Sequence, residues 1–153
     1  MSSFPLTIRI LIVDDMERMR TLVKEQVRAL GYSNFEYAEN GEKAMQMLIQ
    51  QAHSKPFDLI LSDWNMPVVS GLDFLKNVRS NRQFDRVPFL MVTAEADRES
   101  VLSAIKAGAS NYIVKPFTPS TFDQKLQVIA KKVNALDSVS YTHLRAHETG
   151  RNL

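Results

Sequence analysis

The chain has 153 residues, of which 44% are hydrophobic and 24% are charged, a composition typical of one globular domain. The formal net charge of +2, from 19 Lys and Arg against 17 Asp and Glu, is too small to indicate a nucleic acid or a membrane surface as a partner. The chain contains no cysteine, which excludes disulfides, thiol catalysis and thiolate metal ligands. Because no apolar run is long enough to cross a membrane and no signal peptide is visible, we expect a cytoplasmic protein.

The first predicted unit is a strand followed by a helix. Residues 8–13 are β-branched and apolar, which favours a strand, and this strand runs directly into Asp14 and Asp15. Gly31 lies where the helix that follows would end. The apolar residues of this helix recur at helical spacing and are Met16, Met19, Leu22, Val23, Val27 and Leu30.

A second strand and a second helix come next. Residues 35–38 predict the strand, and the pair Asn40-Gly41 predicts a turn after it. The polar residues 53–56 then break the chain before the next apolar run. The apolar face of the second helix comprises Ala44, Met45, Leu48, Ile49 and Ala52.

The third strand is the centre of the predicted fold. Residues 57–62 form a short apolar run that leads straight into Asp63, and Pro67 stops regular structure soon afterwards. Such a run, bounded by turn signals, is typical of a strand that is covered on both faces. A third helix follows Gly71, and its apolar positions are Leu72, Leu75 and Val78.

The fourth unit begins after a polar, loop-like stretch at residues 80–87. Residues 88–92 predict a strand that ends at Thr93. A short helix is expected over residues 98–107, and Gly108 closes it.

The fifth unit completes the alternation. Residues 111–114 predict a strand that ends in Lys115-Pro116, and Pro119 suits the first turn of a last helix. The buried stripe of that helix comprises Phe122, Leu126, Ile129, Ala130 and Val133. Five strands alternating with five helices predict an α/β fold, a doubly wound parallel sheet with helices on both faces.

The last stretch departs from this pattern. Residues 138–153 have no apolar stripe and resemble a translated cloning adapter, so we expect a non-native or disordered tail after a domain of residues 1–137. His143 and His147 are four residues apart, a spacing that can bind metal on a helix. The metalloprotease motif needs glutamate after the first histidine, and Leu144 stands there, so we do not expect a metal site.

Five chemically active side chains each follow a predicted strand. In a parallel sheet all strands point the same way, so these side chains are expected along one edge of the sheet. Crowded carboxylates favour Mg²⁺, and a divalent ion beside an aspartate and a lysine suits phosphoryl transfer. Taken singly, each residue is often only a helix cap, a turn former or a solvated charge. The five are Asp14, Asp15, Asp63, Thr93 and Lys115.

The motifs around these residues resemble the response-regulator receiver domain family, most closely its single-domain chemotaxis members. The resemblance covers about residues 7–135. It implies a flavodoxin-like fold with strand order 2-1-3-4-5 and the site at the switch point of that order. The motifs are Val13-Asp14-Asp15, Ser62-Asp63-Trp64-Asn65-Met66-Pro67, Met91-Val92-Thr93-Ala94-Glu95-Ala96, Ala107-Gly108-Ala109-Ser110 with Tyr112, and Lys115-Pro116-Phe117-Thr118.

The resemblance implies a phosphoacceptor and a metal site. Asp63 is then the phosphorylated residue, and the carboxylates of Asp15 and Asp63 bind Mg²⁺ directly. The backbone carbonyl of Asn65 is a third protein ligand, and Asp14 acts through a metal-bound water.

Further residues are assigned by the same resemblance. Lys115, after which a cis bond to Pro116 is expected, pairs with the phosphoryl group, and the Thr93 hydroxyl bonds to it once it arrives. Asn65 and Glu95 each lie two residues beyond a site residue, and we expect them to set the rate of dephosphorylation.

Phosphorylation is expected to switch a binding surface, because it adds about −1.5 to −2 charge at one site. The resemblance implies that movement of Thr93 allows Tyr112 to turn inward, which would alter a surface that includes Val101, Val114 and Lys125. The resemblance implies a monomer whose partners are a sensor histidine kinase, a flagellar motor switch protein and a phosphatase, with no nucleic acid or membrane.

Two other functions remain open from the residues. The first is a Mg²⁺-dependent phosphohydrolase with an aspartyl nucleophile, but those enzymes separate their two aspartates by one residue, whereas Asp14 and Asp15 are adjacent. The second is an interaction module that has lost phosphorylation, which the complete set of site residues disfavours. A stand-alone receiver outside chemotaxis is also possible, and in either receiver pathway we expect no enzyme acting on a separate substrate.

Overall fold

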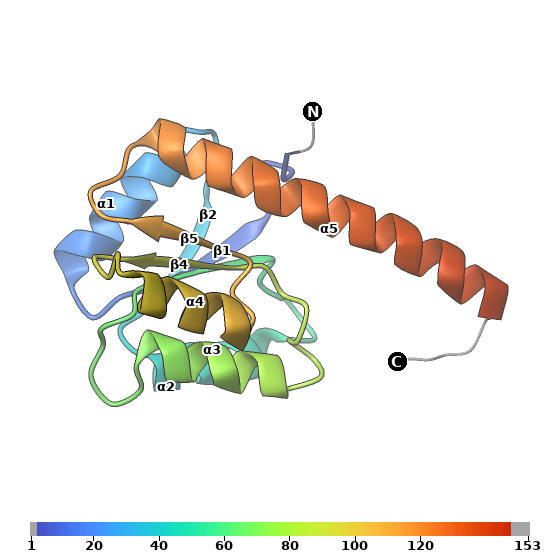
Figure 1. The fold of residues 1–153 in the computed structure, drawn as a ribbon, viewed down its shortest axis with the longest axis horizontal. Coiled ribbons are helices and arrows are strands. Elements are labelled where there is room, and N and C mark those ends of the chain that lie inside the picture. Colours follow the sequence, from blue (N-terminus) through green and yellow to red (C-terminus); the bar gives the residue numbers. More distant parts are fainter. Residues whose placement is uncertain (1–2, 148–153) are drawn as a thin grey trace.

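The computed structural model describes the backbone of residues 3–147 and the side chains of residues 3–134. Its centre is one parallel five-stranded sheet with strand order β2-β1-β3-β4-β5, which confirms the expected fold (Figure 1). The strands are β1 (Arg9–Val13), β2 (Asn34–Ala38), β3 (Leu59–Ser62), β4 (Phe89–Thr93) and β5 (Asn111–Val114).

Five helices cover the sheet in two layers. Helices α1 and α5 lie on one face, and α2, α3 and α4 lie on the other (Figure 1). The helices are α1 (Glu17–Arg28), α2 (Gly41–Gln51), α3 (Gly71–Ser80), α4 (Arg98–Ala107) and α5 (Pro119–His147). Among the described residues, none of these helices combines the length and apolarity that a membrane span requires.

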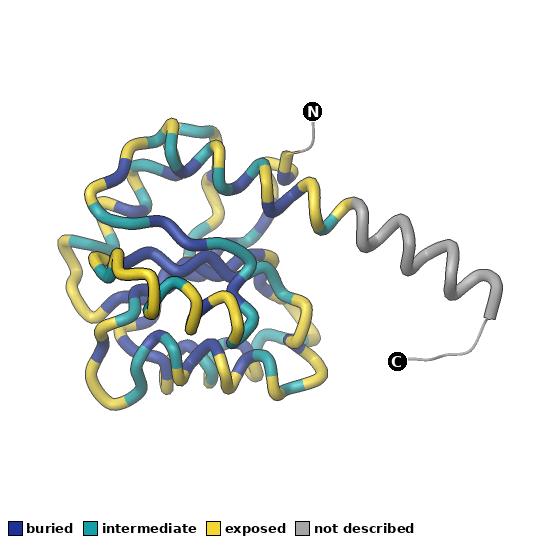
Figure 2. The backbone as a smooth tube through the Cα atoms, viewed as in Figure 1, coloured by how far each residue is buried: buried dark blue, intermediate teal, exposed yellow. Residues whose placement is uncertain are grey.

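The alternation of side chains along β1 explains why both faces are covered. Ile10 and Ile12 pack with α1 and α5, whereas Leu11 and Val13 pack with α2 and α3 in a second core. Successive residues of a strand point to opposite faces, so a strand that is apolar at every position needs a helix layer on each side. Figure 2 shows the middle of the sheet as the buried centre of the molecule, whereas most of the edge strand β2 is not buried.

Three of the helices begin at side-chain caps. The Asn40 Oδ1 atom accepts a hydrogen bond from the Lys43 N–H at 2.8 Å, so Asn40 is the N-cap of α2 rather than part of a separate turn. Ser70 and Asp97 cap α3 and α4 in the same way. These caps satisfy backbone donors that have no partner within the helix and so fix where each helix begins.

Some residues assigned to apolar helix faces are exposed. Met16 is the N-cap residue of α1 and is 55% exposed, because its extended backbone places it before the helix and off the apolar face. Leu22 also lies on the outer side of α1, where Val23 and Val27 are the buried residues. Ile49 is exposed because the buried face of α2 runs through Ala44 and Leu48.

The last helix continues past the domain boundary expected at residue 137. Its buried stripe is the expected one, with Phe122, Leu126 and Ile129 in the core. The backbone remains helical to His147. The side chains of His143 and His147 lie outside the described residues, and the assignment of residues 138–153 to a non-native tail stays a prediction.

Candidate functional site

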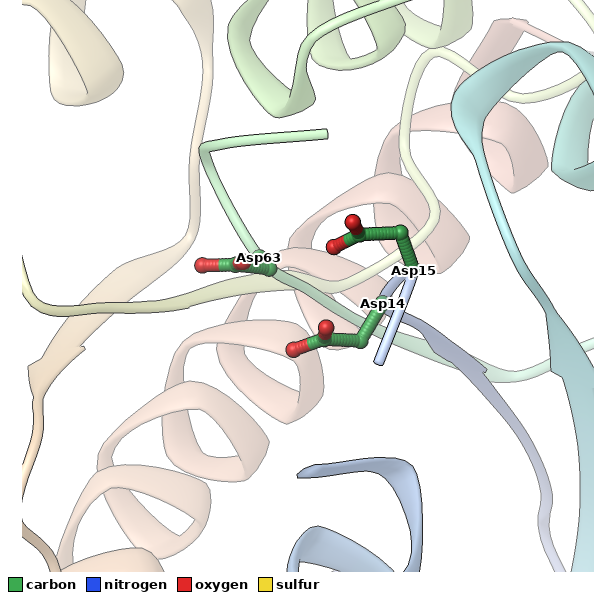
Figure 3. Close-up of side chains that lie close together, drawn as sticks. All are labelled: Asp14, Asp15 and Asp63. Carbon is green, nitrogen blue, oxygen red and sulfur yellow. The ribbon is translucent and has the colours of Figure 1, made fainter. Parts of the chain in front are cut away.

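Three carboxylates converge at the carboxyl ends of two neighbouring strands. Asp14 and Asp15 follow β1, and Asp63 follows β3, with Val13 paired directly to Ser62 in the sheet. Each aspartate offers one carboxylate oxygen, and these oxygens all lie within 4.8 Å of one another (Figure 3). The position is the switch point of the strand order, where α/β folds bind ligands.

The Asp14 side chain is buried and held at several points. Its Oδ1 atom accepts a hydrogen bond from the Met16 N–H at 2.9 Å, and its backbone N–H donates to the Ala38 carbonyl at 3.1 Å. Arg20 donates from Nη1 to the Asp14 carbonyl at 2.7 Å. Burial raises the pKa of the Asp14 carboxyl to about 6, the Met16 N–H acts in the opposite direction, and the charge of Asp63 raises it further.

The Asp63 side chain is 10% exposed and is held by two hydrogen-bond donors. Its Oδ1 atom accepts from the Trp64 N–H at 2.8 Å and from Lys115 Nζ at 3.4 Å. Burial raises the pKa of the Asp63 carboxyl, and Lys115 opposes that rise. The carboxylate is therefore fixed in orientation while one side of it remains reachable from solvent.

The backbone of Asp63 is positioned from behind by α3. The Gly71 N–H donates to the Trp64 carbonyl at 2.7 Å. A Cβ atom on Gly71 would lie 1.9 Å from the Asp63 carbonyl oxygen, so only glycine permits this approach. The buried Ser62 hydroxyl donates to the same carbonyl at 3.0 Å.

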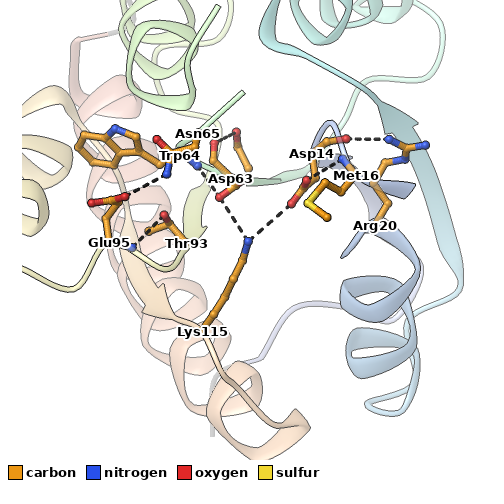
Figure 4. A network of polar contacts seen from close by, with 10 residues as sticks. Asp14, Met16, Arg20, Asp63, Trp64, Asn65, Thr93, Glu95 and Lys115 are labelled. Carbon is orange, nitrogen blue, oxygen red and sulfur yellow. Dashed lines mark hydrogen bonds and ion pairs between the residues drawn. The ribbon is translucent and has the colours of Figure 1, made fainter. Parts of the chain in front are cut away.

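Lys115 brings a positive charge between the two buried carboxylates. It follows β5, and its bond to Pro116 is cis, as the family resemblance implies. Its Nζ atom lies 3.4 Å from Asp63 Oδ1 and 3.8 Å from Asp14 Oδ2, as Figure 4 shows. The ammonium is thus placed to neutralise negative charge that gathers at this edge.

A chain of polar contacts leads from the site to β5. Asn65 Nδ2 donates to Glu95 Oε2 at 3.0 Å, and the Glu95 N–H donates to the Thr93 hydroxyl at 3.2 Å (Figure 4). The Tyr112 hydroxyl donates to the Glu95 carbonyl, and the Tyr112 side chain is buried. Tyr112 therefore already lies inward in this structure, the position that the family resemblance associates with the phosphorylated form.

The remaining residues of the expected switch surface lie away from the carboxylates. Val101 on α4 and Val114 on β5 are half-buried and pack against the core beside Tyr112. Lys125 is a half-buried residue of α5. A change at the carboxylates can therefore reach this surface only through the elements that lie between the two.

The donor set fits a divalent cation of the Mg²⁺ type. Asp14, Asp15 and Asp63 bring three negative charges together, and Lys115 contributes one positive charge. Crowded carboxylates repel each other unless a cation lies between them. Mg²⁺ takes oxygen ligands and is typically held by one or two carboxylates with several waters, which such a cluster can supply.

Sequence reasoning missed the residues that support the site. Arg20, Ser62 and Gly71 each donate a hydrogen bond to a backbone carbonyl. Every residue has a carbonyl, so the sequence does not indicate which one is the partner. Of these three residues, only Gly71 could have been noticed in the sequence. Glycine is a weak helix former, so a glycine at the start of a helix suggests that a side chain would not fit there.

Comparison with known proteins points to one family. The family model described as the response regulator receiver domain matches residues 10–127. Chemotaxis protein CheY-3 of Vibrio cholerae is 44% identical over 125 residues, which cover 82% of this chain and 93% of that protein.

Two solved structures extend the comparison. Chemotaxis protein CheY4 of Vibrio cholerae superposes with a TM-score of 0.69 at 36% identity, over 80% of this chain and 98% of that one. The receiver domain of the sensor histidine kinase PA1611 of Pseudomonas aeruginosa gives a TM-score of 0.67 at 28% identity, over 79% of this chain and 95% of that one. That structure has a magnesium ion coordinated in its active-site cleft.

Proposed function

Because this chain belongs to the response regulator receiver domain family, we propose that it accepts a phosphoryl group on the carboxylate of Asp63 and passes the signal on by binding a partner. Receiver domains are signalling proteins that are phosphorylated by histidine kinases. We base the assignment of Asp63 on its place at the carboxyl end of β3, beside Asp14, Asp15 and the Lys115 ammonium.

In the proposed transfer, a carboxylate oxygen of Asp63 attacks the phosphorus of a phosphohistidine. The new O–P bond forms as the N–P bond breaks, and the imidazole leaves with the electron pair and takes up a proton. Lys115 stabilises the negative charge on the phosphoryl oxygens, and the Thr93 hydroxyl turns from the Glu95 N–H to donate to one of them.

Receiver domains bind Mg²⁺ in their acidic pocket, and we assign the direct ligands here to Asp15, Asp63 and the carbonyl of Asn65. We assign Asp14 to contact through a water, as the family resemblance implies, and its carboxylate is held in place by a hydrogen bond from the Met16 N–H. When bound, the ion supplies positive charge that stabilises the transferring phosphoryl group. The magnesium in the cleft of the PA1611 receiver domain supports this assignment.

We assign the output to the surface formed by Val101, Tyr112, Val114 and Lys125. Tyr112 joins this surface to the site through its hydrogen bond to the Glu95 carbonyl. The similarity to chemotaxis protein CheY-3 supports a flagellar motor switch protein as the partner and chemotaxis as the pathway. We also propose that a sensor histidine kinase is the donor and that a phosphatase ends the signal. The protein would act as a monomer in the cytoplasm.

Asn65 and Glu95 are assigned to control the lifetime of the phosphorylated form. They hydrogen-bond to each other at 3.0 Å beside Asp63, where a water must approach to hydrolyse the acyl phosphate. We expect Glu95→Leu to change the dephosphorylation rate about threefold or more, equivalent to roughly 0.7 kcal/mol in the barrier. The rate is measured by following loss of the phosphorylated mass after the donor is removed. Equal rates for Glu95→Leu, Glu95→Gln and the unmodified protein would show that this pair has no such role.

The proposed function is tested by incubation with acetyl phosphate and Mg²⁺, followed by intact-mass measurement. We expect the unmodified protein to gain one phosphoryl group and Asp63→Asn to gain none. Asp58→Asn is the matched control, since Asp58 is an exposed aspartate just before β3, and it should be phosphorylated normally. Phosphorylation of Asp63→Asn would contradict the assignment, and steady hydrolysis of a simple phosphate ester would favour a phosphohydrolase instead.

A further inference from the structure

Helix α4 is held to the rest of the protein by few apolar contacts of its own. Ala104 is its one buried residue, and alanine buries little apolar surface. Leu102 and Ile105 are 48% and 46% exposed. By comparison, α3 buries Phe74, Leu75 and Val78. A helix with so little buried apolar surface depends strongly on how its two ends are fixed.

The C-terminal end of α4 is fixed by a half-buried arginine from α3. Arg79 Nε donates to the Gly108 carbonyl at 2.9 Å, and Arg79 Nη1 donates to the Phe84 carbonyl at 3.2 Å. Burial lowers the pKa of the Arg79 guanidinium, and the nearby Asp85 opposes that change. A guanidinium that is partly withdrawn from water needs acceptors for its donors, and the two carbonyls supply them, so the position of Arg79 depends on these two bonds.

The backbone at Gly108 is shaped to receive Arg79. Gly108 has φ of +109°, and the N–H groups of Gly108 and Ala109 bond to the carbonyls of Ile105 and Ala104, which together form a Schellman motif. A Cβ atom on Gly108 would lie 2.9 Å from Arg79 Cγ. Just beyond, the Ser110 N–H donates to the Phe89 carbonyl at 2.8 Å, which fastens the chain to β4.

The N-terminal end of α4 is connected to the site instead. Asp97 caps the helix, and two residues earlier Glu95 accepts the hydrogen bond from Asn65. The Glu95 carbonyl accepts from Tyr112, and its N–H donates to Thr93. A rearrangement of these contacts would therefore move the first turn of α4.

We propose that Arg79 is a positioning residue that anchors the C-terminal end of α4 to α3, so that phosphorylation at Asp63 moves mainly the N-terminal end of α4. This inference rests on the proposed function. Helix α3 also carries Gly71, which packs against the Asp63 backbone, so Arg79 ties α4 to the helix that backs the phosphoacceptor. With its C-terminal end held in this way, α4 pivots about Gly108.

The anchor is tested first without a phosphodonor, by hydrogen–deuterium exchange. Arg79→Met keeps an unbranched apolar stem and removes the donors, whereas Arg79→Lys keeps the charge and one donor group. We expect exchange over residues 98–108 to rise about tenfold in Arg79→Met and by a smaller factor in Arg79→Lys, with α1 and α2 unchanged. Arg82→Met, which alters an exposed arginine in the next turn of the chain, is the control and should match the unmodified protein.

Two results of this first measurement would overturn the anchor. One is exchange over residues 98–108 that is the same in both Arg79 variants and in the unmodified protein. The other is faster exchange spread evenly over α1, α2 and α4, which indicates a general loss of stability. If Arg79→Met does not fold, the anchor is judged from exchange over residues 98–108 in Arg79→Lys compared with the unmodified protein.

The pivot is tested with acetyl phosphate and Mg²⁺ in excess throughout labelling. In the unmodified protein we expect phosphorylation to change exchange in residues 98–102 and to leave residues 103–108 as they were. In Arg79→Met the change should extend through residue 108. A change across the whole helix in the unmodified protein would refute the pivot. Intact mass is recorded in parallel, so a protein that takes up no phosphoryl group refutes the proposed function, while the first measurement still decides on the anchor.

Discussion

At the scale of single residues, the site places function in conflict with stability. Asp14 is buried beside Asp63, and burial raises the pKa of its carboxyl from 3.8 to about 6. At neutral pH both carboxyls of this pair must carry charge in a poorly hydrated place, which Lys115 offsets only in part. Such a cluster is retained for what it binds rather than for what it adds to the stability of the fold.

Asp14→Asn should therefore stabilise the metal-free protein at pH 7, by about 1–3 kcal/mol. Asparagine keeps an oxygen for the Met16 N–H and removes the buried charge. Because the folded pKa is raised, the native state takes up the proton first as the pH falls. The penalty is complete above about pH 6 and disappears as the pH falls toward 4, so the two proteins should converge there. Urea unfolding at pH 7 and pH 4 measures this.

The control for this comparison is Glu25→Gln, which neutralises an exposed acid in the middle of α1 and should leave stability nearly unchanged. A variant Asp14→Asn that is no more stable than the unmodified protein at pH 7 would mean that the buried charge is compensated within the fold.

At the scale of elements, the turn between β3 and α3 is the strained part of the site. Val68 has φ of +69°, a left-handed conformation that β-branched residues avoid. The Val69 N–H donates to the Pro67 carbonyl at 2.8 Å and closes a three-residue turn around Val68. The chain on the far side of the turn is fixed by the hydrogen bond from the Gly71 N–H to the Trp64 carbonyl, so the turn cannot relax freely.

Val68→Asn should stabilise the protein by about 1 kcal/mol, because asparagine tolerates the left-handed conformation better than valine does. The Val68 side chain is 76% exposed, so little packing is lost. Thermal unfolding in the absence of metal measures the change. Val128→Asn replaces an exposed valine in the regular helix α5 and should be neutral or slightly destabilising. Similar effects of the two substitutions would show that the Val68 backbone holds no strain.

The sequence predicted the elements well because their signals are local. The helix from Arg98 to Ala107 and the strand from Asn111 to Val114 are those expected from periodicity and from Gly108. The errors lie where tertiary contacts determine whether a residue is buried. Met16 and Ile49 belong to apolar patterns, but the former lies before the helix as its N-cap residue and the latter lies on the outer face of α2. The strain at Val68 had no signal, since valine does not indicate a left-handed turn.

At the scale of the whole molecule, the parallel sheet is what assembles the site. Residues far apart in sequence, such as Asp14, Asp63 and Lys115, meet because every strand delivers its carboxyl end to the same edge. That convergence followed from the sequence pattern alone. The strand order came only from the family resemblance, and the placement of the Lys115 ammonium between two carboxylates depends on side-chain geometry that no periodicity encodes.

The central claim is that Asp14, Asp15 and Asp63 form one cation site, and Trp64 is the natural reporter because its backbone bonds to the Asp63 carboxylate. The most direct measurement is a titration of Trp64 fluorescence with Mg²⁺. We predict a saturable change in the unmodified protein, the same change in Glu17→Gln, which neutralises an exposed acid nearby, and none in Asp15→Ala. An unaltered Mg²⁺ response in Asp15→Ala would contradict the site.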